Sequence, residues 1–126
     1  MNYINLAIEE SKKSTGQQQI GCVIVDKKGK VISRGHNKPT KSHPTQNVYA
    51  TKVGRPEKIY LHAEIDAIVK CRSDPHTIYI GRLLKSGELG ISKPCPICEL
   101  AIIESGIEKI VYTTPEGIVE WNMNKH

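Results

Sequence analysis

Leu61-His62-Ala63-Glu64 is the stretch from which this chain can be interpreted, together with Pro94-Cys95-Pro96-Ile97-Cys98 further along. One histidine and two cysteines suit Zn²⁺, and a zinc site with three protein ligands keeps a fourth position open for water, as catalytic sites do. Glu64 follows His62 by two residues, so it is poorly placed to share the metal but can reach what the metal binds. We predict that Glu64 is the catalytic proton shuttle and that the zinc ligands are His62, Cys95 and Cys98.

The order His-x-Glu, then Pro-Cys-x-x-Cys, is typical of zinc-dependent base deaminases. Either motif alone is common, whereas both in this order and spacing are much rarer. On these motifs the chain resembles the cytidine and deoxycytidylate deaminase superfamily. The resemblance implies a three-layer α/β/α fold, hydrolytic removal of an amino group from a nucleobase, and a homo-oligomer, either a dimer or a tetramer.

The resemblance also implies substrate contacts outside the metal motifs. The backbone of Ala63 would contact the base, and a carbonyl in the segment that begins at Ser92 would accept a hydrogen bond from the exocyclic amine. Asn37 matches an asparagine that contacts a sugar hydroxyl in relatives, the alternative being a turn residue that closes a strand. His36 is a further candidate for contact with the base or a phosphate, the alternative being a surface residue.

Hydrophobic periodicity and turn residues predict an α/β chain. Prolines interrupt any period between residues 38 and 58, so we expect a long functional loop there, with at most one helical turn at 49–53. The two metal motifs would lie at the starts of two helices. The expected elements are helix 2–14, strands 20–26 and 30–37, loop 38–58, helix 59–71, strand 77–84, helix 95–105, and strands 109–114 and 117–121.

Only Pro115 and Glu116 separate the last two expected strands. Two residues are too few for a crossover helix, so these strands must run antiparallel. We therefore expect a mixed five-stranded sheet with an antiparallel final strand. In the superfamily that the chain resembles, free-nucleoside cytidine deaminases share this ending, whereas deoxycytidylate, tRNA-adenosine and polynucleotide deaminases place a helix before a parallel strand.

Composition favours one globular domain, with 38% hydrophobic and 25% charged residues among 126. We expect a single zinc-dependent deaminase domain over residues 1–126. No run approaches the ~18 apolar residues that span a membrane, and the first residues lack a signal-peptide pattern. We therefore expect a cytoplasmic protein with no membrane partner, where cysteines favour metal binding over disulfides.

The formal net charge is +5, and the excess is concentrated in one segment. Between residues 27 and 58 the single acidic residue is Glu57. Such clustering indicates attraction for phosphate, which makes the 38–58 loop a candidate for phosphate contacts; a solvated basic surface is the alternative. The cations are Lys27, Lys28, Lys30, Arg34, Lys38, Lys41, Lys52, Arg55 and Lys58.

Few aromatic side chains are available to stack on a base, since the chain has no phenylalanine. Proteins that bind single strands usually carry an aromatic platform. This scarcity argues against a long single-stranded substrate. The candidates for stacking are Tyr49, Tyr60, His36 and Trp121.

The ligand set and Glu64 together predict hydrolytic deamination of a small-molecule nucleoside or nucleotide, and we favour the cytidine or deoxycytidylate type. A purine deaminase acting on guanine or on adenosine, including adenosine in tRNA, would use the same zinc and glutamate. A zinc site that only stabilises the fold would need a fourth ligand, from Cys22, Cys71 or His36. An alternative of another class is a non-catalytic, zinc-stabilised nucleic-acid-binding module.

Overall fold

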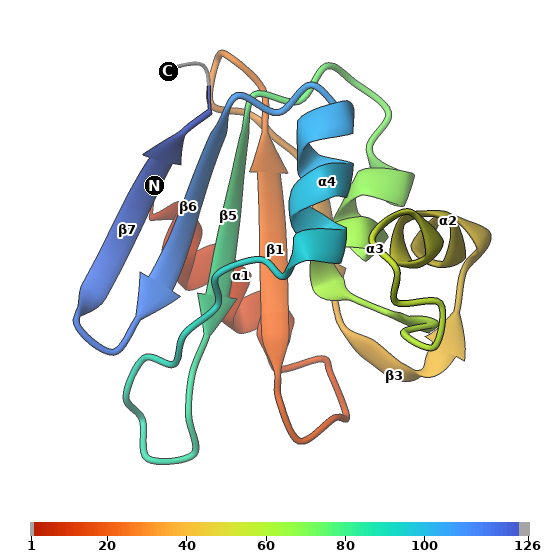
Figure 1. Cartoon of the computed structure of the whole chain (residues 1–126). Helices are drawn as coiled ribbons and strands as arrows, with labels where there is room; N and C mark the ends of the chain where they lie inside the picture. The colour runs from red at the N-terminus through yellow and green to blue at the C-terminus, as the bar shows by residue number, and fades with distance from the viewer. Residues whose placement is uncertain (1, 124–126) are drawn as a thin grey trace.

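Five strands form one mixed sheet in the order β2-β1-β5-β6-β7 in this computed structural model, which describes residues 2–123 (Figure 1). β1 (Ile20–Val25) pairs antiparallel with β2 (Val31–His36) on one side and with β5 (Thr77–Arg82) on the other. β5 pairs parallel with β6 (Lys109–Thr114), and β7 (Gly117–Asn122) is antiparallel to β6. The predicted hairpin at the start of the sheet and its antiparallel final strand are confirmed.

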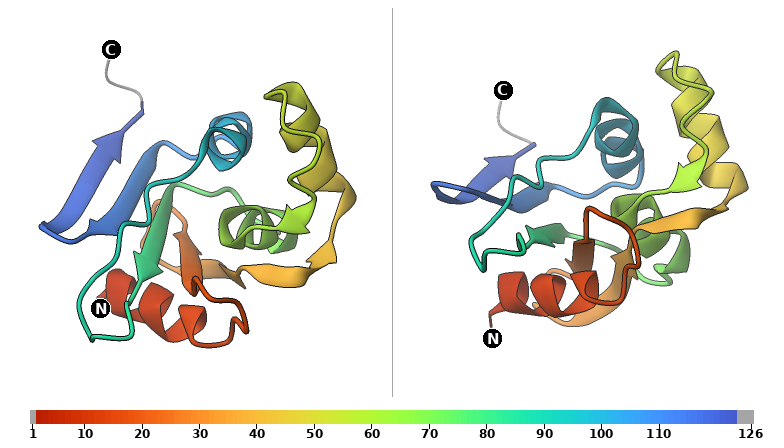
Figure 2. Two further views of the ribbon diagram at one scale, coloured as in Figure 1. Left: turned by 60° about the horizontal axis from the view of Figure 1, so that its bottom comes forward. Right: turned by 90° about the horizontal axis from the view of Figure 1, so that it is seen from below.

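Helices cover both faces of this sheet (Figure 2). α1 (Tyr3–Ser11) packs on one face against β1 and β5, and α3 (Ala63–Lys70) packs with α4 (Pro96–Glu104) on the other. The predicted three-layer α/β/α arrangement is therefore confirmed. A fourth helix, α2 (Pro44–Lys52), packs against α3 and α4 rather than against the sheet.

Alternate side chains of the central strands divide the core between the two faces. Val23 of β1 packs in a cluster with Ala7 of α1. Its neighbour Ile24 packs in a second cluster with Ala67 of α3 and Ile102 of α4. Because β1 is covered on both faces, its sequence is a continuous run of small and apolar residues rather than an alternating one.

β2 and α3 approach each other more closely than a side chain would allow. A Cβ atom added to Gly35 would lie 2.5 Å from the backbone nitrogen of Ala67 and 2.6 Å from the carbonyl oxygen of Ala63. Glycine is required at this position for close backbone packing. The contact fixes the first turn of α3, which carries Glu64, against the sheet.

The prediction of a long loop at 38–58 is wrong. The segment forms β3 (Lys38–Ser42) and the nine-residue α2 (Pro44–Lys52). His43 caps this helix, because its Nδ1 accepts a hydrogen bond from the backbone N–H of Thr45 at 3.1 Å, and Pro44 occupies the first turn. The buried residues of α2 are Gln46 and Ala50, so the helix lacks the apolar stripe from which helices are predicted.

Helix boundaries also differ from prediction. The helix expected at 59–71 begins only at Ala63, because residues 60 and 61 form a short strand, β4 (Tyr60–Leu61), that pairs with β3. The helix expected at 2–14 ends at Ser11, and the one expected at 95–105 begins at Pro96. Within residues 2–123, every helix is too short or too polar to cross a membrane.

Candidate active site

The predicted metal ligands meet where two helices begin. His62 is the N-cap of α3, Cys95 is the N-cap of α4, and Cys98 lies in the first turn of α4. The Nδ1 atom of His62 lies 3.2 Å from the Sγ of Cys98 and 3.5 Å from the Sγ of Cys95. Figure 1 shows the starts of α3 and α4 close together near one end of the sheet.

This donor set fits zinc. In a tetrahedral site, bonds of about 2.1 Å to nitrogen and about 2.3 Å to sulfur put the ligand atoms about 3.6–3.8 Å apart. The three ligand atoms here all lie within 4.8 Å of one another. In the part of the chain that the structure describes, this cluster includes neither Glu64 nor any of the fourth ligands that a closed site would need, Cys22, Cys71 or His36. The site thus offers three protein ligands, as catalytic zinc sites do.

The two thiols differ in their tendency to ionise. A hydrogen bond from Cys98, against the opposing effect of burial and with help from His62, lowers the pKa of Cys95 to about 4. Burial and the neighbouring Cys95 raise the pKa of Cys98 well above its ordinary value. Cys95 is therefore a thiolate at neutral pH, and a cation that binds both sulfur atoms must displace the Cys98 proton.

Glu64 lies in the first turn of α3 and is 5% exposed. Burial raises the pKa of its carboxyl above the ordinary value, against the opposing effect of His62. A raised pKa lies closer to neutral pH than the ordinary value of a carboxyl. A group that both accepts and donates a proton during a reaction needs such a pKa.

A cavity of about 430 Å³ opens beside the metal cluster. It brings together predicted residues from three separate parts of the chain, at 37, 62–64 and 92–95. Cys98 is completely buried and His36 lies elsewhere, so neither contributes to the lining. The lining residues are Gln18, Ile20, Asn37, His62, Ala63, Glu64, Arg82, Ile91, Ser92, Lys93 and Cys95.

Asn37 borders the cavity and makes hydrogen bonds within the protein. Its Oδ1 accepts from the backbone N–H of Ile20 at 2.9 Å, and its Nδ2 donates to the carbonyl of Gln18 at 2.6 Å. These bonds hold the segment before β1 at the cavity wall. Asn37 therefore shapes the site in the way a strand-closing residue does, and a sugar contact stays a prediction.

The Ser92 hydroxyl is buried and fully engaged. It accepts a hydrogen bond from the backbone N–H of Thr113 at 2.9 Å and donates to the carbonyl of Ile80 at 3.0 Å. The side chain thus anchors the segment before Cys95 to the ends of β5 and β6. Any substrate contact from Ser92 would come from its backbone, as predicted for this segment.

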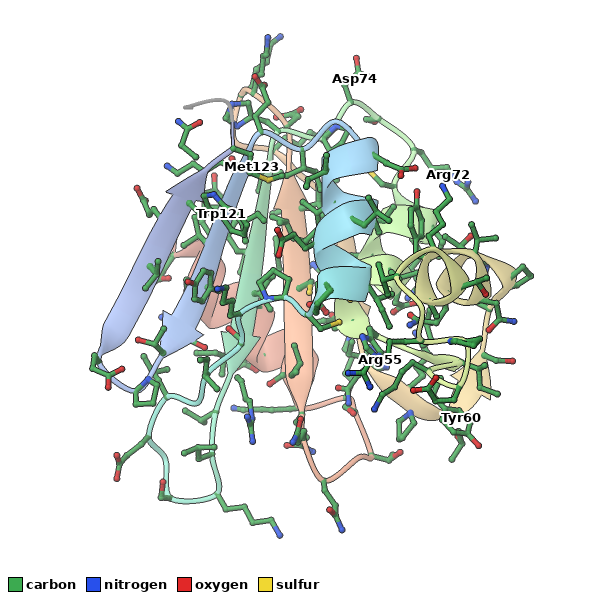
Figure 3. All side chains as sticks on the ribbon, viewed as in Figure 1. Arg55, Tyr60, Arg72, Asp74, Trp121 and Met123 are labelled. Atoms are coloured by element: carbon green, nitrogen blue, oxygen red, sulfur yellow. The ribbon has the colours of Figure 1, made fainter. Side chains whose placement is uncertain are left out.

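His36 lies apart from the cavity. Its Nδ1 lies 2.8 Å from a carboxyl oxygen of Glu10 on α1, and its backbone N–H donates to Asp66 on α3 at 3.1 Å. Both contacts tie β2 to helices on opposite faces of the sheet. The predicted stacking residues do not line the cavity either; Trp121, for example, packs on the sheet near Met123 (Figure 3).

Several residues at the site, among them Gln46 and Arg82, were not predicted from the sequence. Gln46 of α2 is completely buried; its side chain accepts from the backbone N–H of His62 at 3.1 Å and donates to the carbonyl of Lys58 at 3.2 Å. Arg82 ends β5, lines the cavity and donates to the carbonyl of Ile91 at 3.4 Å. Gln46 carries no sequence signal, whereas a cation at the end of a central strand could have been singled out.

Sequence comparison places this site in a known family. The model of the cytidine and deoxycytidylate deaminase zinc-binding region matches residues 1–114. The chain is similar to the tRNA-specific adenosine deaminases of Bacillus subtilis (27% identical over 112 residues) and Aquifex aeolicus (29% over 115 residues). These matches cover 87% and 88% of this chain but 58% and 63% of the relatives, so the chain spans about three fifths of their length.

Solved structures share the fold. The dCMP deaminase from the cyanophage S-TIM5 superposes with a TM-score of 0.61 at 22% identity, covering 89% of this chain and 79% of that one. The cytidine deaminase from Mycobacterium leprae superposes with a TM-score of 0.59 at 17% identity, covering 94% and 89%. Together with the family match and the His-Cys-Cys cluster, these results show that the chain belongs to the cytidine and deoxycytidylate deaminase zinc-binding family.

Proposed function

We propose that this protein is a zinc-dependent hydrolytic deaminase that converts the cytosine base of a nucleoside or nucleotide to uracil and releases ammonia. The observation that carries the proposal is the convergence of the zinc-binding trio and the buried carboxyl of Glu64 at one cavity. His62, Cys95 and Cys98 would hold the metal. Glu64 lies beside them without belonging to the cluster.

When bound, the zinc ion supplies the Lewis acidity that makes water a nucleophile at neutral pH. Glu64 accepts one proton from this water, whose oxygen bonds to C4 of the base, and delivers the proton to the ring nitrogen N3. Glu64 then moves the remaining hydroxyl proton to the exocyclic nitrogen. The bond between C4 and that nitrogen breaks, ammonia leaves, and a carbonyl remains.

Other lining residues would orient the base for this reaction. The backbone of Ala63 and the carbonyls of the segment 92–94 would contact its polar edge, and the side chains of Ile20 and Ile91 would contact its faces. Asn37 would contact the sugar. This division is supported by the lining of the cavity, which among the described residues includes apolar side chains and Ala63 beside Glu64 but no phenylalanine, tyrosine or tryptophan.

The choice of a pyrimidine rests on the antiparallel β6–β7 hairpin, the ending that the resemblance associates with free-nucleoside cytidine deaminases. Adenosine is the second candidate, because both curated relatives reported above are named tRNA-specific adenosine deaminases and the same groups can attack C6 of adenine. A non-catalytic module would gain nothing from a buried carboxyl at the cavity, which is costly to desolvate.

We place the enzyme in the cytoplasm, where thiolate ligands stay reduced, and we expect the homo-oligomer that the resemblance implies.

The direct test is ammonia release by the zinc-loaded protein from cytosine, cytidine, deoxycytidine, deoxycytidylate, guanine, adenosine and short single strands. We expect turnover of a cytosine-containing member, and turnover lower by about 10²-fold or more in Glu64→Gln. Glu116→Gln, in the exposed β6–β7 turn, is the matched control and should retain activity. Turnover of adenosine alone would favour the second candidate. Zinc binding without ammonia release from any member would contradict the proposal.

A further inference from the structure

A second cavity, of about 450 Å³, adjoins the first on the side of α2. The two cavities share Gln18 and the metal ligands His62 and Cys95. A group in the second cavity is therefore next to a base held in the first. Its remaining lining residues are Val53, Arg55, Lys58, Pro96 and Ile97.

The second cavity is basic. Arg55 and Lys58 both line it, none of its lining residues is an aspartate or glutamate, and the thiolate of Cys95 would be bound to zinc. A cavity with two cations and no carboxylate attracts a phosphate group, which arginine can bind through two parallel hydrogen bonds and lysine through its point charge.

The other cations of the basic segment are used or placed elsewhere. Lys38 binds Asp66 at 2.6 Å, and Lys52 lies 3.3 Å from Glu104. The turn that carries Lys27, Lys28 and Lys30 joins β1 to β2 at the end of the sheet opposite the starts of α3 and α4 (Figure 1). Arg34 and Lys41 are exposed and line neither cavity. The charge cluster seen in the sequence thus reduces to two cations at the site.

The segment that carries Arg55 and Lys58 is held by backbone hydrogen bonds. Arg55 N–H donates to the carbonyl of Ala50 at 2.7 Å, and Lys58 N–H donates to the carbonyl of Arg55 at 3.0 Å. Gly54, with φ of 78°, turns the chain at the end of α2. Gln46 then links Lys58 to His62. The turn is therefore connected to the metal site through a buried side chain.

The ion pair between Arg55 and Glu57, which would compete with a phosphate for the Arg55 guanidinium, is weak. Arg55 lies 3.8 Å from Glu57, and both side chains are at least 60% exposed. An exposed pair at this distance contributes little, so a phosphate can displace it. Figure 3 shows Arg55 near the start of α4, with Tyr60 farther toward the periphery.

We propose that Arg55 and Lys58 form a phosphate subsite, so that the enzyme deaminates a base within a nucleotide in preference to a free base or nucleoside, although it has the antiparallel ending that the resemblance associates with free-nucleoside enzymes. The inference rests on the proposed function and deepens it by naming the substrate class. The phosphate has two sources, a mononucleotide or a nucleic-acid strand.

A third cavity offers a way to distinguish a mononucleotide from a nucleic-acid strand as the source of the phosphate. It has a volume of about 490 Å³ and shares Arg82 with the first cavity, the one that contains Glu64. Lys12 and Lys85 also line it. A strand that runs past the first cavity would place phosphates in both the second and the third cavity. A mononucleotide would use the Arg55 and Lys58 cavity alone.

The test compares two double variants with equal loss of charge. Arg55→Gln/Lys58→Gln removes the subsite, and Arg34→Gln/Lys41→Gln is the control on exposed positions that line neither cavity. We expect the first to lower kcat/KM for deoxycytidylate by about 10- to 100-fold, as loss of charge-assisted hydrogen bonds does. Its kcat/KM for deoxycytidine should change by less than about twofold, and the control should match the wild type on both substrates.

To identify the source of the phosphate, kcat/KM of the Lys12→Gln/Lys85→Gln variant is measured with a short cytosine-containing strand and with deoxycytidylate. A lower kcat/KM for the strand alone identifies a strand as the substrate. An unchanged kcat/KM for both the strand and deoxycytidylate identifies the mononucleotide. Wild-type protein that turns over deoxycytidine and deoxycytidylate equally, with no effect of Arg55→Gln/Lys58→Gln, overturns the subsite and leaves the proposed deamination intact.

Binding of inorganic phosphate gives a readout that does not need turnover. In the zinc-loaded protein, phosphate should shift the backbone amide signals of residues 53–55, 57 and 58 in the wild type and in the Arg34→Gln/Lys41→Gln control. The shifts should be absent in Arg55→Gln/Lys58→Gln. Equal binding by all three proteins overturns the subsite, whereas selective binding without ammonia release from any substrate supports the subsite and contradicts the proposed function.

Discussion

The buried side chain of Gln46 accepts a hydrogen bond from the backbone N–H of His62 at 3.1 Å. It also donates to the carbonyl of Lys58 at 3.2 Å. One residue of α2 therefore fixes both the extended segment that precedes α3 and the turn that follows α2. Because His62 is an N-cap with no side-chain cap bond of its own, this external bond orients the histidine toward the two cysteines.

Gln46→Ala should loosen the metal site. The change leaves two partly buried backbone groups, the N–H of His62 and the carbonyl of Lys58, without their side-chain partner, which costs up to about 1–3 kcal/mol each, and we expect weaker zinc binding together with lower stability. Asn47→Ala, at the next and exposed position of the same helix, is the control. Zinc competition titrations and chemical denaturation measure both effects. Unchanged zinc affinity in Gln46→Ala would contradict a positioning role for Gln46.

Cys98→Ser should abolish stoichiometric zinc binding. The thiolate is the ligand that zinc prefers, and Cys98 is completely buried at the cluster. Cys71→Ser is the matched control, because Cys71 lies outside the cluster and its thiol contacts the carbonyl of Ser73. Metal analysis after dialysis should find zinc in the control and not in Cys98→Ser. Equal zinc in both proteins would remove Cys98 from the ligand set.

Asp66 should make stability depend on pH in the acid range. Burial raises the pKa of its carboxyl, but hydrogen bonds from Lys38 and Lys70 and from the backbone N–H of His36 outweigh burial, so the net pKa is lowered. A lowered pKa in the folded state stabilises the protein above the ordinary aspartate value of about 4, and this stabilisation is lost as pH falls through the folded-state pKa.

The Asp66 prediction is measured as the free energy of unfolding between pH 7 and pH 3. Asp66→Asn should be less stable than the wild type at pH 7, and the difference should shrink at acid pH. Asp74→Asn, at an exposed position in the connection before β5, is the control. A constant difference across the pH range would show that the Asp66 charge does not stabilise the fold.

Gly35→Ala should displace α3 from β2. The added Cβ would lie at 2.5–2.6 Å from two backbone atoms of α3, and overpacking of this kind costs about 1–3 kcal/mol. Arg34→Ala, the exposed neighbour on β2, should change stability little. Thermal or chemical denaturation distinguishes the two variants, and equal stability would contradict the close packing of β2 on α3.

The central sheet and the metal site could be predicted from the sequence because their signals are local. Lys27, Lys28 and Gly29 between two β-branched runs define the first hairpin, and Pro115 with Glu116 defines the last. The residue types and spacing of His62, Cys95 and Cys98 are sufficient to indicate zinc chemistry. These features depend on neighbouring residues and on the ligand preferences of a metal.

The rest depends on tertiary contacts. α2 escaped prediction because Gln46, not an apolar residue, is buried on its inner side, and His43 caps it with a ring nitrogen. His36 was a candidate for contact with the base or a phosphate, yet its ring lies against Glu10. The segregation of Arg55 and Lys58 from the other basic residues arises only when the chain is folded. The substrate contacts of Asn37, Ala63 and Ser92 and the homo-oligomer stay predictions.

The most direct test of the central claim is to measure zinc content and ammonia release side by side in the wild type and in Glu64→Gln. If Glu64 moves protons without binding the metal, the variant keeps one zinc per chain and loses about 10²-fold or more in kcat. Loss of zinc from Glu64→Gln would show that Glu64 is a ligand. Full ammonia release with zinc retained would show that the proton is moved by another group.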